Sequence, residues 1–375
     1  MKNEAIKNVT ITVIFDGSAL NRDEAIGGNI LSIKKINVNG ETRSFIGKPA
    51  LRHYLFQSLH RGFHWVPAKV TGDEQVVQFD LTKDDIISNA ELDVFGYMFT
   101  LGKKETAITR KSPLGITKAI SLFPYESDLA FYSNHDLVAR GKNEGMNVSP
   151  SPVNKEEQNS FYKVSFTLDT LIVGQDTWII NERNYENNTL CLIFSITKEK
   201  RLERKIKCTK ESDESAKEEI YSVEENGKNG KELGKIYIKK VNSEEPGKGP
   251  YKVRFELAKD QKKKRISEVL TAITNGLYAQ SSGEANTIIP LFLIAGAVKI
   301  PSPVFHPYID IRRDGSQWRV IGIGDALNNY WIEKSDGRPI VYIRDSERLK
   351  VEPAFKEESE KSWETFLKKL GLSSD

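Results

Sequence analysis

The apolar positions at the start of the chain predict a buried strand, a loop and a helix. Residues 9–15 are β-branched or aromatic and precede Asp-Gly-Ser, a pattern typical of a central strand that ends in a loop. A polar, glycine-rich loop leads to a short strand at residues 30–38. A helix is predicted over residues 49–62, where Pro49 suits the first turn and Gly62 the C-cap. Its apolar residues share one face at helical spacing: Leu51, Tyr54, Leu55 and Leu59.

The rest of the chain has the pattern of short strands with two further helices. Helical spacing recurs within residues 266–273 and 363–370. The strands expected from apolar runs are residues 75–81, 116–123, 161–168, 189–196, 304–311 and 318–323. No internal repeat is evident. The order of strand, helix, strands, insertion, helix and strands predicts an α+β fold of the split βαβ type with large loop insertions.

Residues 198–264 differ in composition from the segments on either side. They include 20 basic and 14 acidic residues among 67, so the segment is predicted to project from the core. Residues 235–241 and 251–257 look like paired strands around a turn-rich stretch, which indicates a projecting β-ribbon. The basic residues of its first part are candidate contact residues: Lys200, Arg201, Arg204, Lys205 and Lys207.

These patterns divide the chain into five parts. The predicted parts are 1–62 (first part of the core, with the loop and helix), 63–160 (core strands with inserted loops), 161–197 (core strands), 198–264 (the charged ribbon) and 265–375 (completion of the core and a C-terminal helix).

Composition excludes several classes of protein. The 375 residues carry 55 Lys and Arg against 52 Asp and Glu, so any nucleic-acid site must be local. The longest apolar run, residues 287–298, is shorter than the ~20 residues of a membrane span. No secretory signal is evident, and Cys191 and Cys208 have no pairing motif. We therefore expect a cytoplasmic protein with no membrane association, disulfide framework, metal or cofactor.

The motifs of common enzymes are missing or incomplete. His60 and His64 are four residues apart, but the glutamate of the zinc-protease motif is lacking and Gly62 should end the helix between them. Gly47-Lys48 lacks the spacing of a nucleotide-triphosphate loop. What remains is the general attraction of a helix N-terminus for phosphate.

Basic residues are concentrated in residues 22–61, where seven bases stand against three acids. The bases are Arg22, Lys34, Lys35, Arg43, Lys48, Arg52 and Arg61. Positive loops on an α+β sheet favour a single nucleic-acid strand, bound through its phosphates with little sequence preference.

The same stretch resembles a known family. Ala19-Leu20-Asn21-Arg22-Asp23-Glu24, a Gly27-Gly28 turn, Arg43 and Ala50-Leu51-Arg52-His53 are similar to the N-terminal signature of backbone subunits of type I CRISPR surveillance complexes (Cascade), in the DevR-type branch of subtype I-B. Three later motifs also fit: residues 111–116 (Lys-Ser-Pro-Leu-Gly-Ile), 131–134 (Phe-Tyr-Ser-Asn) and 281–286 (Ser-Ser-Gly-Glu-Ala-Asn).

The resemblance implies a fold, a function and a set of partners. It implies a modified RRM/ferredoxin-like (RAMP-type) core that polymerises along a guide RNA (crRNA) as a helical filament. A projecting thumb folds over the guide, and target DNA pairs in segments between thumbs. Residues 198–264 are the candidate thumb, with an insertion within 63–160 as the alternative. The implied partners are crRNA, target DNA, copies of the same chain, a small RAMP-type subunit that caps the guide 5′ end, a large subunit and a guide-processing endoribonuclease.

The RNA-binding residues implied by position in these motifs are Asn21, Arg22, Lys34, Lys35, Arg43, Lys48, Arg52, His53, Arg110, Lys111 and Ser112.

Two other functions compete with a non-catalytic binding subunit. A guide-processing endoribonuclease of the same superfamily would use a histidine such as His53 or His60 as general base, but its C-terminal glycine-rich loop is not matched. A transcriptional autoregulator is suggested by the DevR name, although no helix-turn-helix is readable.

Overall fold

The structure is a computed structural model with a mixed, strand-rich α/β fold. It describes residues 5–19, 22, 30–72, 76–100, 107–126, 128–195, 201–211, 218–225, 230–241, 248–281 and 284–372. Asn21 and Lys200, two of the candidate contact residues, lie outside these ranges.

A central antiparallel sheet is built around β1 (Asn8–Ser18), which is buried almost throughout. β1 pairs on one side with β13 (Asn159–Leu168) and on the other with β23 (Phe292–Val298). The strand order is β28-β23-β1-β13-β10-β4-β3, and β9 also pairs with β13. The other strands are β28 (Val341–Arg344), β10 (Ala119–Ser121), β4 (Glu41–Ile46), β3 (Lys35–Val38) and β9 (Leu114–Ile116). The expected strands at 30–38 and 116–123 are thus each split in two.

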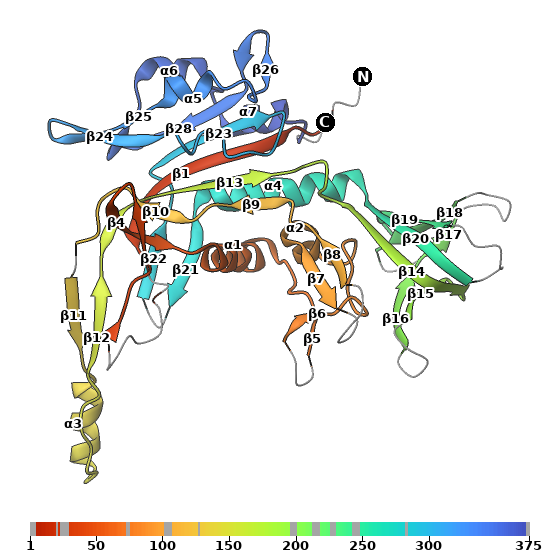
Figure 1. The fold of residues 1–375 in the computed structure, drawn as a ribbon, viewed down its shortest axis with the longest axis horizontal. Helices are drawn as coiled ribbons and strands as arrows, with labels where there is room; N and C mark the ends of the chain where they lie inside the picture. The colour runs from red at the N-terminus through yellow and green to blue at the C-terminus, as the bar shows by residue number, and fades with distance from the viewer. Residues whose placement is uncertain are drawn as a thin grey trace.

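Two long helices cover one face of this sheet, α1 (Lys48–Phe63) and α4 (Lys259–Asn275) (Figure 1). Their apolar sides form one core with β1 and β13, and the side chain of Leu55 is fully buried there. Six elements of this core follow one another along the chain in the order β1, α1, β10, β13, α4 and β23, with other elements between them. The expected C-cap is wrong by two residues, because α1 continues through Gly62 and His64 takes the left-handed conformation (φ 60°).

Residues 299–340 and 345–352, on either side of β28, cover the opposite face of the central sheet. Phe292, Ile294 and Phe305 are buried between the sheet and this layer. The layer contains a small sheet of β24 (Asp310–Asp314), β25 (Gln317–Ile321) and β29 (Leu349–Lys350). The strand expected at residues 304–311 is wrong, since 304–308 form turns that place Phe305 in the core. The remaining elements from residue 299 onward are α5 (Ile323–Leu327), β26 (Lys334–Ser335), β27 (Arg338–Pro339), α6 (Pro353–Glu358) and α7 (Trp363–Lys369).

A second sheet, of seven strands, contains most of the charged segment. Its order is β16-β15-β14-β20-β19-β18-β17. Its strands are β14 (Gln175–Glu186), β15 (Thr189–Ser195), β16 (Arg201–Lys207), β17 (Thr209–Lys210), β18 (Glu219–Glu224), β19 (Glu232–Lys240) and β20 (Lys248–Leu257). The expected pairing of 235–241 with 251–257 is confirmed by β19 and β20.

The segment at 198–264 does not form a ribbon by itself. The strands of that segment join β14 and β15, and one face of the sheet has a core of its own in which Trp178, Tyr221 and Phe255 are fully buried. Charged residues alternate with apolar ones along these strands, so half the positions can be charged while the other half fill a core. The last residues of the segment begin α4.

Short elements between α1 and β9 pack against the second sheet. Leu81, Ile86 and Phe99 belong to its core. These elements are β5 (Val70–Thr71), β6 (Gln78–Phe79), α2 (Ala90–Phe95), β7 (Tyr97–Thr100) and β8 (Ala107–Arg110).

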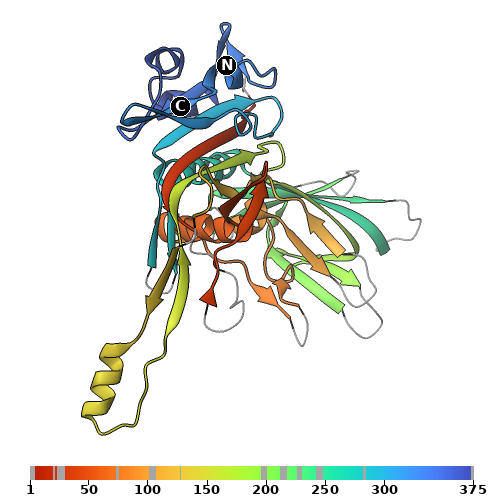
Figure 2. The ribbon, with the colours of Figure 1, turned by 60° about the vertical axis from the view of Figure 1, so that its left-hand side comes forward.

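An arm projects from the body, formed by β11 (Asp128–Tyr132), α3 (His135–Asn143) and β12 (Val153–Glu157) (Figures 1 and 2). The two strands pair antiparallel, and β2 (Ile30–Leu31) pairs in parallel with β12 at the base of the arm. A hairpin of β21 (Leu277–Ser281) and β22 (Glu284–Ile288) lies beside the end of β1. An insertion within residues 63–160 thus projects from the body.

Across the described ranges, no helix combines the length and the apolar character that spanning a membrane requires.

Candidate nucleic-acid interface

Three segments that are distant in the sequence meet at the base of the arm. Arg22 follows β1, and its side chain is 11% exposed. Its Nη1 donates to Glu284 Oε2 of β22 at 2.9 Å, and its Nε donates to the Glu156 carbonyl of β12 at 3.2 Å. Lys155 also bonds Glu284. The motifs that contain Arg22 and Glu284 therefore join the arm to the core.

The β21–β22 hairpin is held against the end of β1 by side-chain to backbone bonds. The Asn286 amide accepts from the Ser18 N–H at 3.1 Å and donates to the Ser18 carbonyl at 2.5 Å. Thr287 Oγ1 donates to the Asp16 carbonyl at 2.6 Å. Asn286 of the motif at residues 281–286 thus positions the hairpin, which the sequence alone did not indicate.

Glu156 is the acidic centre of the arm base. Burial by itself raises the pKa of this carboxyl, but hydrogen bonds from Lys35, Ser32 and the Ile33 N–H outweigh burial and lower it. The same balance, with Lys155 and Arg22 as donors, lowers the pKa of Glu284. Both groups are therefore held as carboxylates, which fix Arg22 and Lys35 in place.

Lys35 and Arg43 lie on the paired edge strands β3 and β4, and the Lys34 carbonyl next to β3 accepts from the Phe45 N–H of β4 at 3.0 Å. Lys35 Nζ lies 4.5 Å from the ring centroid of Tyr125, and the Tyr125 N–H donates to the Thr42 carbonyl. Arg43 Nη1 donates to the Ser121 carbonyl at 3.2 Å, and its Nη2 pairs with Glu41 at 2.8 Å. The structure thus brings Arg22, Lys35 and Arg43 to one edge, where all three are engaged in the fold.

The arm exposes a series of apolar side chains. Leu129 and Phe131 of β11 are 55% and 63% exposed, and Leu137 and Met146 near the tip are 62% and 53% exposed. At the base, Tyr132 donates to Glu157 Oε1 at 2.5 Å. A pocket of about 290 Å³, lined in part by Tyr132 and Arg22, opens there. Apolar groups in such number on a projecting element are typical of a contact surface.

The candidates on α1 separate into exposed and paired residues. Lys48 and His53 are exposed, and within the described ranges no acidic side chain pairs with either. Arg52 points to α2, where its Nη2 pairs with Glu91 at 3.1 Å and its guanidinium lies 4.6 Å from the Phe95 ring. Arg52 therefore packs α1 against α2.

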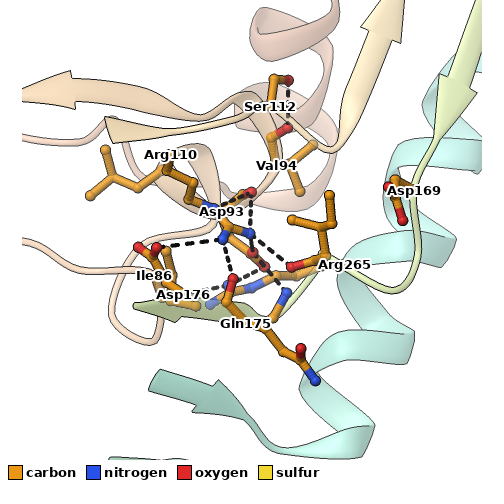
Figure 3. Close-up of polar contacts among 12 residues, drawn as sticks. Ile86, Asp93, Val94, Arg110, Ser112, Asp169, Gln175, Asp176 and Arg265 are labelled. Carbon is orange, nitrogen blue, oxygen red and sulfur yellow. Dashed lines mark hydrogen bonds and ion pairs between the residues drawn. The ribbon is translucent and has the colours of Figure 1, made fainter. Parts of the chain in front are cut away.

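Arg110 and Ser112, which were predicted to face RNA, are both bonded within the fold, and Arg110 is buried. The Arg110 side chain is 3% exposed and pairs with Asp93, which also pairs with Arg265 of α4 at 2.9 Å (Figure 3). Ser112 Oγ lies within bonding distance of the Val94 and Leu114 carbonyls. Lys111 between them is exposed. Alternation along an extended segment explains why neighbouring candidates have opposite environments.

Asp93, Arg110 and Arg265 form a buried cluster of ion pairs, here called the hub. Asp176 of β14 also belongs to it, because its Oδ1 lies 3.8 Å from Arg110 Nη1. Burial raises the pKa of its carboxyl, and Tyr97 donates to it at 2.5 Å. Burial and the nearby Asp176 raise the pKa of Tyr97. Trp178 in turn donates to the Tyr97 hydroxyl at 2.6 Å. The hub ties the second sheet to α2 and α4.

The basic residues proposed for a thumb lie on β16, at one edge of the second sheet. Arg204 pairs with the buried Asp85 at 2.5 Å, and Arg201 pairs with Glu182 at 2.7 Å. Lys205 lies 3.7 Å from Glu203, whereas Lys207 is exposed. These residues are distant along the chain and in the fold from the projecting arm.

The histidines do not gather into a metal site. His60 Nδ1 lies 2.6 Å from the Trp65 carbonyl, and His64 occupies the C-cap of α1. Among the residues that the structure describes, no group of three or more His, Cys, Asp or Glu side chains is placed to hold a metal ion.

Sequence reasoning missed the residues that build the arm. Lys155 and Glu156 were not among the candidate residues, yet they connect the arm to Arg22, Lys35 and Glu284. The available signal was the run Asp-Leu-Ala-Phe-Tyr at residues 128–132, which has strand composition.

Comparison with known proteins gives a family. No curated protein matches the sequence. A chain in a structure described as "CRISPR RNA-guided surveillance complex, pre-nicking" is similar, with 8% identity, 83% of each chain covered and a TM-score of 0.43. The family model described as "CRISPR-associated negative auto-regulator DevR/Csa2" matches residues 9–314. Because this match covers well over half of the chain, the protein belongs to the CRISPR-associated DevR/Csa2 family.

Proposed function

We propose that this protein is the multi-copy, guide-RNA-binding backbone subunit of a type I-B Cascade complex. The observation that carries the proposal is the family match over residues 9–314, within which motifs around Arg22, Tyr132 and Glu284 meet at the base of a projecting arm. In this role the chain would act in the cytoplasm, polymerise along crRNA and present the guide to target DNA.

The order of the core elements supports an RRM-like interpretation. β1, α1, β10, β13, α4 and β23 follow in the order strand, helix, strand, strand, helix, strand. Their spatial order is β23-β1-β13-β10, with both helices on one face. This is the arrangement of a ferredoxin-like βαββαβ unit.

The arm at residues 128–157 replaces the charged segment as the proposed thumb. It projects, and its exposed Leu129 and Phe131 could insert between bases, since stacking and apolar contact tolerate any base sequence. Arg22 and Lys35 would support the arm from below rather than bind phosphates by themselves. The exposed Lys48 and Lys111 are the proposed phosphate contacts, and the exposed His53 lies further along α1.

We also propose that the subunit does not catalyse a reaction. No acidic side chain pairs with the exposed His53 in the described part of the chain, and His60 Nδ1 lies 2.6 Å from the Trp65 carbonyl.

The proposal is tested by purifying the chain with its neighbouring gene products and sequencing the nucleic acid that it retains. Repeat-flanked RNAs of uniform length, in a particle whose mass falls after ribonuclease treatment, are expected. A monomer without RNA, or a protein that cleaves repeat RNA, would contradict it.

The family description favours one second candidate, negative auto-regulation. In that case the chain would bind DNA upstream of its own gene more tightly than unrelated DNA. A gel-shift competition with the two DNAs separates this function from the sequence-independent binding of a backbone subunit.

A further inference from the structure

The small sheet β24–β25–β29 carries a row of three basic side chains on its exposed face. Arg312 of β24 lies directly opposite Arg319 of β25, and Arg319 lies directly beside Lys350 of β29. Ile311 and Val320, on the other face of the sheet, pack into the core. Strand alternation therefore orients the three basic residues away from the core, in a row ~10 Å long at a strand spacing of ~4.8 Å.

This row is only partly balanced by acids. Arg319 Nε pairs with Asp314 at 2.7 Å, and Asp310 shares the strand face with Arg312. Burial raises the pKa of the Asp345 carboxyl, but hydrogen bonds from Lys356 and the Val351 N–H lower it. The nearby charge of Lys350 lowers it further, so Lys350 faces one acid. Arg312 is exposed and pairs with no acid in the described part of the chain. Like charges on directly opposite strand positions destabilise a sheet, so the row indicates an external anion.

The position of the sheet favours a polynucleotide as that anion. The Trp318 ring of β25 lies 5.0 Å from Phe123, two residues beyond the Ser121 carbonyl that accepts from Arg43. Nearby, Arg348 pairs with Asp16, at the end of β1, at 2.7 Å. In Figure 1 the β24–β25 hairpin lies at the upper left and the arm at the lower left, with the end of β1 between them. A strand bound at the arm base could therefore continue across the row.

We propose that Arg312, Arg319 and Lys350 form a second phosphate-binding surface for nucleic acid. Arginine matches the geometry of phosphate oxygens in a bidentate manner, and two of the three residues are arginines. Arg319 and Lys350 lie beyond residues 9–314, so the surface extends past the part of the chain that the family model covers. The proposal does not depend on filament formation or on the identity of the guide.

The test measures binding of the full-length chain to a fluorescent single-stranded RNA of mixed sequence over a series of salt concentrations. The triple variant Arg312→Ala, Arg319→Ala, Lys350→Ala is expected to bind on the order of tenfold more weakly at physiological salt. Its salt slope should fall by about two, since each lost contact to a single strand contributes ~0.7.

A matched control separates position from net charge. The control variant Lys334→Ala, Arg338→Ala, Lys368→Ala removes the same number of basic residues. All three are exposed and none belongs to the row. The control variant is expected to keep the wild-type affinity and slope. An equal loss in both variants, or no loss in the first, would overturn the proposal. The proposal would also be overturned if the triple variant of the row binds RNA normally but no longer co-purifies with a neighbouring protein subunit. That result would show that the row binds an acidic protein.

Should the triple variant fail to fold, Arg312→Gln alone provides the measurement. Arg312 is exposed, so this change should leave the thermal unfolding temperature unchanged and still lower the salt slope by about 0.7. An unchanged slope for a folded Arg312→Gln protein would also overturn the proposal.

Discussion

At the scale of single residues, Asp93 shows how a buried charge holds separate segments together. Its side chain is fully buried and accepts from Arg110 at 2.7 Å, from Arg265 at 2.9 Å and from the Gly174 N–H at 2.8 Å. Asp93→Asn leaves two buried guanidinium groups without their shared carboxylate. We expect the free energy of unfolding to fall by about 3–5 kcal/mol, as measured by urea denaturation.

The control for this change is Asp136→Asn. Asp136 forms an ion pair with Arg140 in which both side chains are about seven-tenths exposed, so its loss should cost less than about 1 kcal/mol. Equal stability of the Asp93 variant and the wild type would show that the hub does not stabilise the fold.

His306 gives a prediction for pH. Burial first, and then the nearby Lys163, lower the pKa of His306 to about 4, and its Nδ1 lies 2.8 Å from Ser165 Oγ. The unfolded chain binds this proton with a pKa near 6.5, so the proton favours unfolding between these values. Stability should fall as pH drops from about 6.5 towards 4.

The variant His306→Asn keeps a polar group near Ser165 but cannot take up this proton. Thermal unfolding temperatures measured between pH 7 and 5 should decline less for this variant than for the wild type. The exposed His135→Asn serves as control and should decline like the wild type. Parallel declines for all three proteins would contradict the assignment.

At the scale of elements, the spacing of apolar residues predicted several strands and helices of the structure. The strand at 9–15, the helix at 49–62 and the pairing of 235–241 with 251–257 correspond to β1, α1 and the β19–β20 pair. The core of the second sheet was not predicted, because the charge content of a segment does not show how charged residues alternate with core residues such as Ile236 and Phe255.

The candidate site was predicted less well, because side-chain partners come from distant segments. The basic residues could be located from the sequence, but the acidic residues that form ion pairs with them could not. Arg22 is bound by Glu284, and Lys35 by Glu156, each more than 100 residues away. Arg110 is buried by contacts with α2 and β14, which no local pattern indicates.

The arm is the element whose removal should separate folding from function. Tyr132 and Val153 are the last paired residues of the β11–β12 ladder before α3. Residues 133–152 can therefore be replaced by an Asn-Gly turn. Val138 is the one buried residue of α3, and we therefore expect an unchanged unfolding temperature. Under the proposed function, the shortened protein should lose guide RNA when co-purified with its neighbours.

A second variant tests whether the apolar tip, and not arm length alone, matters. Leu137→Ser with Met146→Ser keeps the whole arm and removes two exposed apolar groups. Partial loss of retained RNA is expected. Full retention by the shortened protein would exclude the arm as the thumb.

At the scale of the whole molecule, the near-neutral chain should bind nucleic acid through a few unpaired basic residues. Lys48 and Lys111 are exposed and pair with no acid among the described residues, whereas Arg22 and Arg52 hold the fold together. The variant Lys48→Ala, Lys111→Ala should therefore weaken binding equally for unrelated RNA sequences, with a salt slope lower by about 1.4. Fluorescence anisotropy over a salt series measures both quantities.

Substitution of the paired arginines should have a different effect. Arg52→Ala removes the pair with Glu91 and the contact with Phe95, so it should lower the unfolding temperature more than it lowers the salt slope. If Arg52→Ala instead flattens the salt slope and leaves stability intact, then Arg52 leaves Glu91 for phosphate when RNA binds. A loss confined to one RNA sequence in the Lys48 and Lys111 variant would mean that the protein contacts base edges, because phosphates carry no sequence information.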